Sequence, residues 1–190
     1  MLRRSAIRFL LLAAICWAPA FGQEPLHFPE PYGRVNDFAH ILDAKTVSRL
    51  QKLSEEVDAK THAQIAVVTV DTVGKGSIND YATALFNHWG IGHAGDNRGI
   101  LILLAVSDHK WRIEVGRGLE TLFPNARAAK IGATMVPDLK HEDYSKALWH
   151  TASEIAQILA RDRGVELTST AAGRPRALQQ LPPKKIAETL

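Results

Sequence analysis

The sequence predicts an α/β fold, an αβα sandwich in which a small mixed β-sheet lies between helices. Two nearly continuous apolar runs, 64–70 and 100–106, have the β-branched and aliphatic composition of strands buried on both faces. Segments with apolar residues at helical spacing lie before, between and after these runs. Because a helical crossover joins the two runs, we expect them to pair in parallel.

The ends of the helices are marked by capping residues. Asp43 is the expected N-cap of the first helix, and Ser77 is that of the second. We expect Asn125 to cap a third helix that Pro137 ends, and Gly164 to stop the last helix. The predicted order of elements is therefore α-β-α-β-β-α-α.

The second of the two adjacent strands in this order is the stretch 111–115, which follows a short turn. Its polar residues, Arg112 and Glu114, alternate with apolar ones. Such alternation is typical of a strand that buries one face. We expect this strand to run antiparallel to 100–106, at or near an edge of the sheet.

The first 22 residues predict a cleavable signal peptide. Three arginines, Arg3, Arg4 and Arg8, form a basic start. An apolar run over residues 9–17 follows, and small residues lead to a cleavage point after Gly22. The run is shorter than the ~20 residues of a membrane span. We therefore expect a periplasmic or secreted protein, with no stable membrane span after removal of the signal.

Removal of the signal changes the charge of the chain. The full sequence has 23 Lys and Arg against 20 Asp and Glu, a formal net charge of +3. The three signal arginines leave with no acidic residue, so the remaining chain is formally neutral. A neutral chain does not favour nucleic acid as a partner. Cys16, the only cysteine, leaves too, which excludes a disulfide, a Cys-zinc site and a thiol nucleophile.

The composition divides the chain into four parts. Residues 1–22 are the expected signal peptide, and residues 23–33 form a Pro-rich extended leader. Residues 34–164 carry the helix and strand patterns of one domain. Residues 165–190 have little periodicity and several prolines, and we expect them to form a flexible tail.

Antiparallel pairing of the last two strands brings two loops to one end of the sheet. The glycine-rich loop 90–99 enters one strand, and residues 116–125 follow the other. Oxygen-donor side chains from these loops and the adjoining strand are the predicted metal ligands, namely Asp96, Asn97, Glu114, Glu120 and Asn125. Carboxylate and amide oxygens suit a hard cation such as Ca²⁺.

These residues also have structural explanations. Asp96 and Asn97 suit a turn, Glu114 could pair with Arg112, and Asn125 could serve only as a helix cap.

Two other candidate sites are less specific. His88 and His93 could hold a transition metal with Asp96. The opposite end of the sheet gathers another polar group, Asp71, Thr72, Ser107 and Asp108.

A string of motifs resembles the TPM-domain family, which includes plant thylakoid-lumen and photosystem II repair proteins and many exported bacterial proteins. The resemblance covers roughly residues 34–162. The motifs that carry it are Val35-Asn-Asp37, Trp89-Gly-Ile-Gly92, Asp96-Asn97, Arg112-Ile-Glu-Val-Gly116 and Gly118-Leu-Glu120.

The resemblance implies an αβα sandwich with an acidic cleft, Ca²⁺ binding in some relatives, and weak acid-phosphatase activity in a plant relative. Two departures bear on a cation site. Arg117 stands where Tyr is common, and Pro124-Asn125 stands where relatives often carry Thr-Asp. A lost carboxylate weakens a cation site, and a nearby guanidinium competes for the remaining carboxylates.

Two functions follow from this sequence. The favoured one is an exported, non-enzymatic accessory module that binds a protein partner, and a Ca²⁺ ion, in an acidic cleft, because no nucleophile–base pattern is present. The alternative is a weak metal-assisted acid phosphatase acting on phosphomonoesters. In it Asp96, Glu114 and Glu120 would hold the cation, and Arg117 would contact the phosphate anion.

Overall fold

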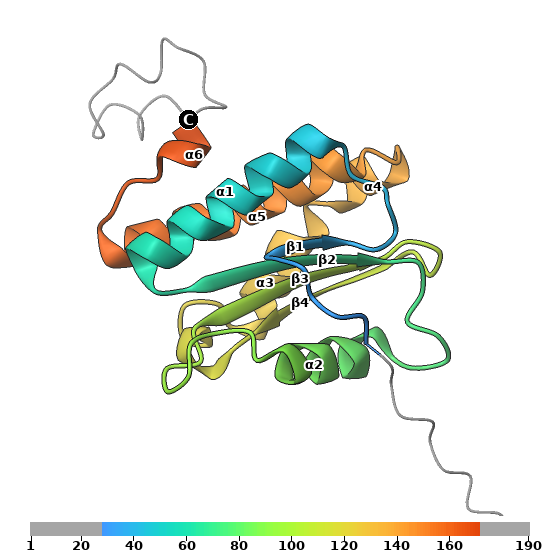
Figure 1. Cartoon of the computed structure of the whole chain (residues 1–190), viewed down its shortest axis with the longest axis horizontal. Coiled ribbons are helices and arrows are strands. Elements are labelled where there is room, and N and C mark those ends of the chain that lie inside the picture. The colour runs from blue at the N-terminus through green and yellow to red at the C-terminus, as the bar shows by residue number, and fades with distance from the viewer. Residues whose placement is uncertain (1–27, 172–190) are drawn as a thin grey trace, which may run out of the picture.

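The computed structural model describes residues 28–171 (Figure 1). The predicted signal peptide, residues 23–27 of the predicted leader and the predicted tail from residue 172 onward lie outside the described residues. Within residues 28–171, no helix is long and apolar enough to cross a membrane.

A four-stranded mixed sheet forms the centre of the domain, in the order β1 (Val35–Asp37), β2 (Gln64–Val70), β3 (Gly99–Ala105) and β4 (Lys110–Val115). The first three strands are parallel, and β4 is antiparallel to β3. The predicted pairing of the buried strands and of the hairpin is therefore confirmed. One row of apolar side chains crosses the whole sheet, through Val35, Val67, Ile102 and Ile113.

Strand β1 corrects the predicted order of elements, because no strand was expected before the first helix. It has only three residues, and two of them, Asn36 and Asp37, are polar although both are buried. A strand this short has no period that a hydrophobic pattern can reveal.

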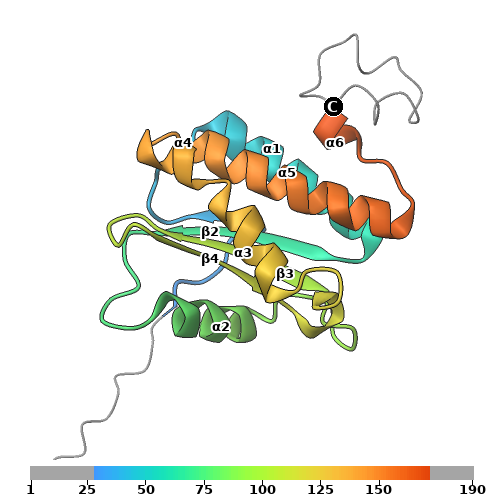
Figure 2. The ribbon, with the colours of Figure 1, turned by 180° about the vertical axis from the view of Figure 1, so that it is seen from behind.

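Helices cover both faces of the sheet, as an αβα sandwich requires. Figures 1 and 2 show α1 and α5 together on one face and α2 on the other. After β4 the chain passes through the short 3-10 helix η1 and then α3 and α4 before it reaches α5. The bounds are α1 (Ala44–Thr61), α2 (Ile78–Trp89), η1 (Arg117–Leu119), α3 (Asn125–Ala133), α4 (Val136–Lys140) and α5 (Tyr144–Arg163).

The sheet separates two hydrophobic cores. The larger core packs α1, α3 and α5 against one face, and the smaller core packs α2 against the other. The alternation in β4 matches this division. Its apolar residues pack in the larger core, whereas Glu114 bonds to Thr83 of α2 on the opposite face. Arg112 pairs with Glu114 on that same face.

Three of the predicted helix ends are confirmed. Asp43 Oδ1 accepts a hydrogen bond of 2.8 Å from the Thr46 amide at the start of α1. Ser77 caps α2, and Gly164 ends α5 with a left-handed φ of 64°. Such a φ favours glycine because it has no Cβ.

The predicted ends of the third helix were wrong. Pro124 is the N-cap of α3, and Asn125 is the first helical residue, without a side-chain cap. Pro137 does not end α3, since it lies in the first turn of α4. A proline is tolerated there because the first-turn amides have no partner within the helix.

Residues that precede and follow the predicted domain in the sequence pack against it. The short helix α6 (Thr168–Ala171) follows α5, and Leu167 before it is buried. Residues 165–171, which the sequence assigned to the tail, are thus held against α1 by Glu56. At the other end, Phe28 packs edge-on to Tyr81 of α2, with ring centroids 5.1 Å apart.

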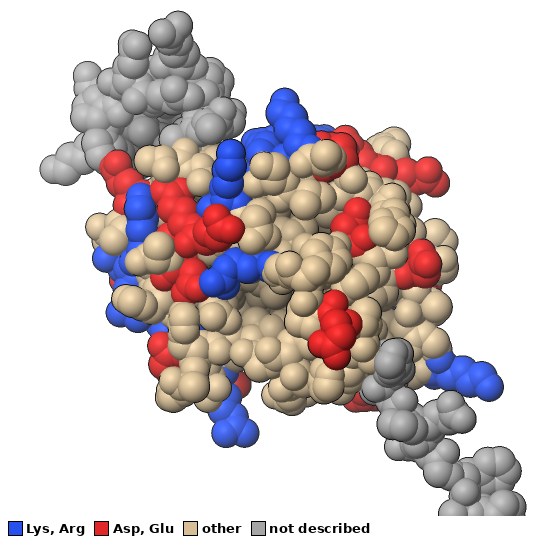
Figure 3. Space-filling view, viewed as in Figure 1, with Lys and Arg blue, Asp and Glu red and all other residues tan. Residues whose placement is uncertain are grey.

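The charged side chains of both signs are interspersed on the face of the molecule shown in Figure 3. Acidic groups gather beside basic ones over α1, and no field of a single sign extends across the described residues on this face. Such a surface gives little long-range attraction to a polyanion.

Candidate functional site

The two loops expected to meet do lie against each other at one end of the sheet. The Gly116 amide donates to the Gly99 carbonyl at 2.8 Å, and the Gly118 amide donates to the Asn97 carbonyl at 3.3 Å. A Cβ atom at Gly118 would overlap the carbonyl oxygen of Asp96, and one at Gly116 would overlap that of Asn97. Glycine is therefore required at both positions for the loops to touch.

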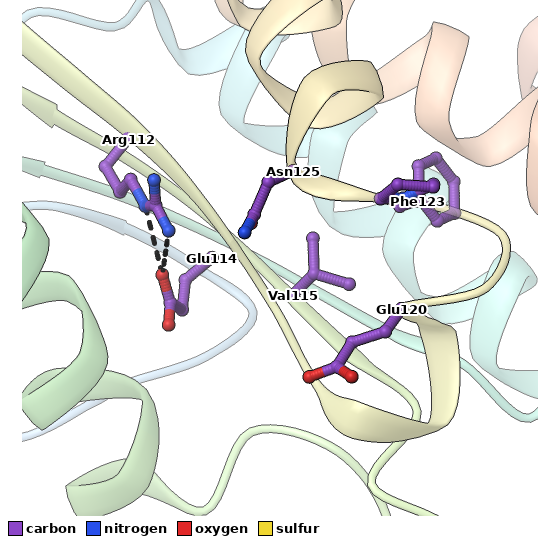
Figure 4. A pocket seen from close by; sticks show the side chains of 7 residues that line it. Arg112, Glu114, Val115, Glu120, Phe123 and Asn125 are labelled. Carbon is purple, nitrogen blue, oxygen red and sulfur yellow. Dashed lines mark hydrogen bonds and ion pairs between the residues drawn. The ribbon is translucent and has the colours of Figure 1, made fainter.

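A pocket of about 390 Å³ lies beside β4 and the start of α3. Figure 4 shows that the side chains of Glu120 and Asn125 both turn toward β4. The pocket combines charged and apolar residues, namely Arg112, Glu114, Val115, Glu120, Phe123, Pro124 and Asn125.

The Arg112 and Glu114 side chains in this pocket are already paired. Arg112 Nε and Nη2 lie 3.0 Å and 2.9 Å from the same Glu114 oxygen, Oε2. The hydroxyl of Thr83 donates to the other oxygen, Oε1, at 2.9 Å. Glu114 is therefore fixed between its own strand and α2. Its pairing with Arg112 is the structural explanation that the sequence offered for this residue.

Three of the predicted metal ligands line this pocket, and two do not. Glu114, Glu120 and Asn125 line it, whereas the side chains of Asp96 and Asn97 do not. Asp96 Oδ1 accepts a hydrogen bond of 3.1 Å from the Arg98 amide, which is turn chemistry. Asn97 adopts a left-handed φ of 49°.

Arg117, the predicted anion contact, is exposed on η1 and does not line the pocket.

The described residues do not gather a set of classical metal ligands. In residues 28–171, no group of three or more His, Cys, Asp or Glu could hold a metal ion. His93 Nε2 lies 2.5 Å from Asp58 of α1, and His88 packs beside Phe28 with ring centroids 5.3 Å apart. The two histidines thus have separate partners.

The opposite end of the sheet uses its polar groups in turns. Asp108 accepts hydrogen bonds of 2.8 Å from the Val73 amide and from the Thr72 hydroxyl. These two hydrogen bonds lower the pKa of Asp108 below its usual value. The Asp108 carboxylate therefore fixes two loops to each other.

Asp37 is a buried carboxylate for which the sequence predicted no role. Its Oδ1 accepts from the Thr69 hydroxyl at 2.5 Å and from the Ile41 amide at 3.2 Å. Its Oδ2 accepts from the Leu42 amide at 2.9 Å. The only sequence signal was the motif Val35-Asn-Asp37 itself, because a polar pair at a strand end has no periodicity.

Comparison with known proteins gives relatives across most of this domain. The sequence model of the TPM domain matches residues 35–158. The UPF0603 protein YdjH of Bacillus subtilis is 23% identical over 158 residues, which is 83% of this chain. The chain spans 59% of the length of that relative.

Solved structures share the fold at low sequence identity. The N-terminal domain of a P. gingivalis protein, solved by NMR, matches with a TM-score of 0.65 and 23% identity, over 70% of this chain and 86% of that domain. The BA42 protein of Bizionia argentinensis matches with a TM-score of 0.55 and 18% identity, over 68% of this chain and 92% of that protein. With the family model matching well over half of its length, the chain belongs to the TPM domain family.

Proposed function

We propose that this protein is an exported TPM-domain accessory module that binds a protein partner at the pocket beside β4. The observation that carries the proposal is the pocket itself, which has both charged and apolar lining residues, with the Glu120 carboxylate turned toward β4. A cavity of about 390 Å³ is too small for a protein surface and fits an inserted side chain or a small molecule.

Export is supported by the order of basic, apolar and small residues at the N-terminus. An exported module that binds a partner needs neither a nucleophile nor a general base. Its requirement is a rigid surface, and the loops fixed by Gly116 and Gly118 provide one beside the pocket.

Site-specific photo-crosslinking in the native host tests partner binding. Thr121 is exposed and adjoins Glu120 without lining the pocket, so it can be replaced by p-benzoylphenylalanine. We expect a discrete adduct after irradiation of the exported fraction. The same replacement at exposed Glu142, away from the pocket, should give no adduct. Identical adduct patterns at both positions, or none at either, would contradict the proposal.

A Ca²⁺ ion is the alternative ligand of this pocket, because Glu114, Glu120 and Asn125 bring oxygen atoms to it, although Arg112 already engages Glu114. An ion that binds only the native state raises the melting temperature. If Ca²⁺ occupies the pocket, excess Ca²⁺ raises the melting temperature of chelator-treated protein, and Glu120→Ala abolishes the rise. An unchanged melting temperature in the unsubstituted protein would refute the calcium site.

A metal-assisted phosphatase is the second candidate. The observation in its favour is that a guanidinium and two carboxylates share one pocket, as phosphate binding beside a metal requires. The Arg112 guanidinium is already engaged by Glu114, which argues against it. We expect phosphomonoester hydrolysis to stay at background with Ca²⁺, Mg²⁺ and Mn²⁺ in turn. Turnover that is lost in Glu120→Gln would establish the phosphatase instead.

A further inference from the structure

Some of the charged side chains in the pocket beside β4 have partners within the protein, and one does not. Arg112 and Glu114 neutralise each other through two contacts to one oxygen, and Thr83 satisfies the other carboxylate oxygen. This pair contributes no net charge to a ligand. The charge that remains in the pocket is that of Glu120.

The Glu120 carboxylate has no partner among the described residues. Within residues 28–171 its side chain makes neither a hydrogen bond nor an ion pair, and it is exposed. Figure 4 shows it turned toward β4, on the same side as the Asn125 amide. The pocket therefore presents one free carboxylate and one free amide to a ligand.

The rest of the lining is apolar. Val115 and Pro124 line the pocket with Phe123, whose side chain is almost fully buried. Such a wall suits the aliphatic stem of a long cationic side chain, whose charged end can remain at a polar rim.

A bare metal ion fits this arrangement poorly. Ca²⁺ takes six to eight oxygen ligands, whereas this pocket offers one free carboxylate and one amide beside a carboxylate already paired to arginine. The cavity, at about 390 Å³, also has room for many atoms besides an ion. An organic cation with an apolar stem fills the volume and neutralises Glu120.

We infer that the pocket receives a lysine or arginine side chain of the partner protein, with its stem on Val115 and Pro124 and its charged end at Glu120 and Asn125. This inference rests on the proposed function, since it names the chemistry by which the partner would be recognised. Both cationic side chains share the required features, a positive end and an aliphatic stem.

A titration with a blocked amino acid tests the inference. Nα-acetyl-lysine N-methylamide is added to the ¹⁵N-labelled protein, and amide shifts are followed by NMR. We expect saturable shifts of the amides of residues 115, 120–123, 125 and 126, with a Kd on the order of 1–10 mM for a ligand of this size. The norleucine analogue has nearly the same stem without the charge, and it should bind about fivefold more weakly or not at all.

Two variants separate the role of Glu120 from a general effect of charge. Glu120→Gln should weaken lysine binding about fivefold, whereas Glu142→Gln, at an exposed position elsewhere, should leave the Kd unchanged. Equal binding of lysine and norleucine, or an unchanged Kd in Glu120→Gln, overturns the inference. So does saturation of the same amides by Ca²⁺ with no response to lysine.

The failure of this inference and that of the proposed function can be told apart. If lysine does not bind but the crosslink at position 121 still forms, the partner is recognised by different chemistry and only the inference fails. If the crosslink is absent, the proposed function fails whatever the titration shows.

Discussion

At the scale of single residues, the site depends on glycines that allow two loops to touch. Gly116 and Gly118 follow β4, and the carbonyls of Asn97 and Asp96 lie against their Cα atoms. The glycine-rich strings in the sequence therefore mark a close approach of two backbones. Gly116 and Gly118 themselves do not line the pocket.

Replacing Gly118 tests this close approach. A Cβ in Gly118→Ala would overlap the Asp96 carbonyl oxygen, so we expect a loss of about 1–3 kcal/mol in the free energy of unfolding. Urea denaturation measures it. Gly76→Ala is the matched control, because the nearest atom to its Cβ, the Val73 carbonyl oxygen, is 4.0 Å away. Equal midpoints for the two variants would contradict the steric argument.

The buried carboxylate of Asp37 leads to a second prediction. It accepts three hydrogen bonds, from Thr69, Ile41 and Leu42. In Asp37→Asn the amide group cannot accept all three, and a buried unsatisfied donor costs about 1–3 kcal/mol. Chemical denaturation of Asp37→Asn should show this loss. Asp71→Asn, at an exposed position, should leave the midpoint unchanged, and equal losses in both would be contrary to expectation.

Side-chain orientation was the part of the site that the sequence predicted least well. Strand register brings Asp96 and Glu120 to the same end of the sheet, and the spacing of residues shows this. Register does not decide which way a loop side chain points. The Asp96 carboxylate bonds to the Arg98 amide two residues away, and a local turn of this kind competes with any distant ligand.

At the scale of elements, α6 is held to the domain through one carboxylate. Glu56 of α1 accepts hydrogen bonds from the Thr168 and Ser169 amides, at 2.7 Å and 2.8 Å, and from Lys60 at 2.7 Å. Burial alone would raise the pKa of Glu56, but the hydrogen bonds from Lys60, Ser169 and Thr168 lower it well below its usual value.

The depressed pKa of Glu56 predicts a pH dependence. A carboxylate with a lowered pKa in the folded state stabilises the protein above its ordinary pKa of 4.5, and this contribution is lost as the pH falls below that value. Glu56→Gln should therefore lower the melting temperature at pH 7, and the difference from the unsubstituted protein should narrow below pH 4.5. A difference that stays constant between pH 7 and pH 3 would contradict the role of Glu56.

The sequence predicted the helices and strands that have a long, regular pattern of apolar residues. It did not predict the short ones that have no such pattern. The strands β2 and β3 and the helix α5 follow apolar patterns of sufficient length. The strand β1 and the helix α6 have three and four residues, and tertiary hydrogen bonds hold them in place. Short elements of this kind gain their stability from packing, so local sequence does not reveal them.

For the whole molecule, the positions of the basic residues lead to a prediction about export. The chain carries a formal +3, and three arginines of the first 22 residues account for all of it. We expect the exported protein to begin at Gln23. Mass spectrometry of the secreted or periplasmic fraction checks this, and a protein that retains Met1 in that fraction would contradict cleavage after Gly22.

We propose that the partner is recognised at the pocket through Glu120. The most direct test is the yield of the crosslink from position 121 in two proteins, one with Glu120 and one with Glu120→Gln. Glu120 is exposed, so its replacement should leave the fold intact, and the melting temperature verifies this. We predict that Glu120→Gln reduces the adduct several-fold at an unchanged melting temperature. An undiminished adduct in Glu120→Gln would show that recognition of the partner does not depend on this carboxylate.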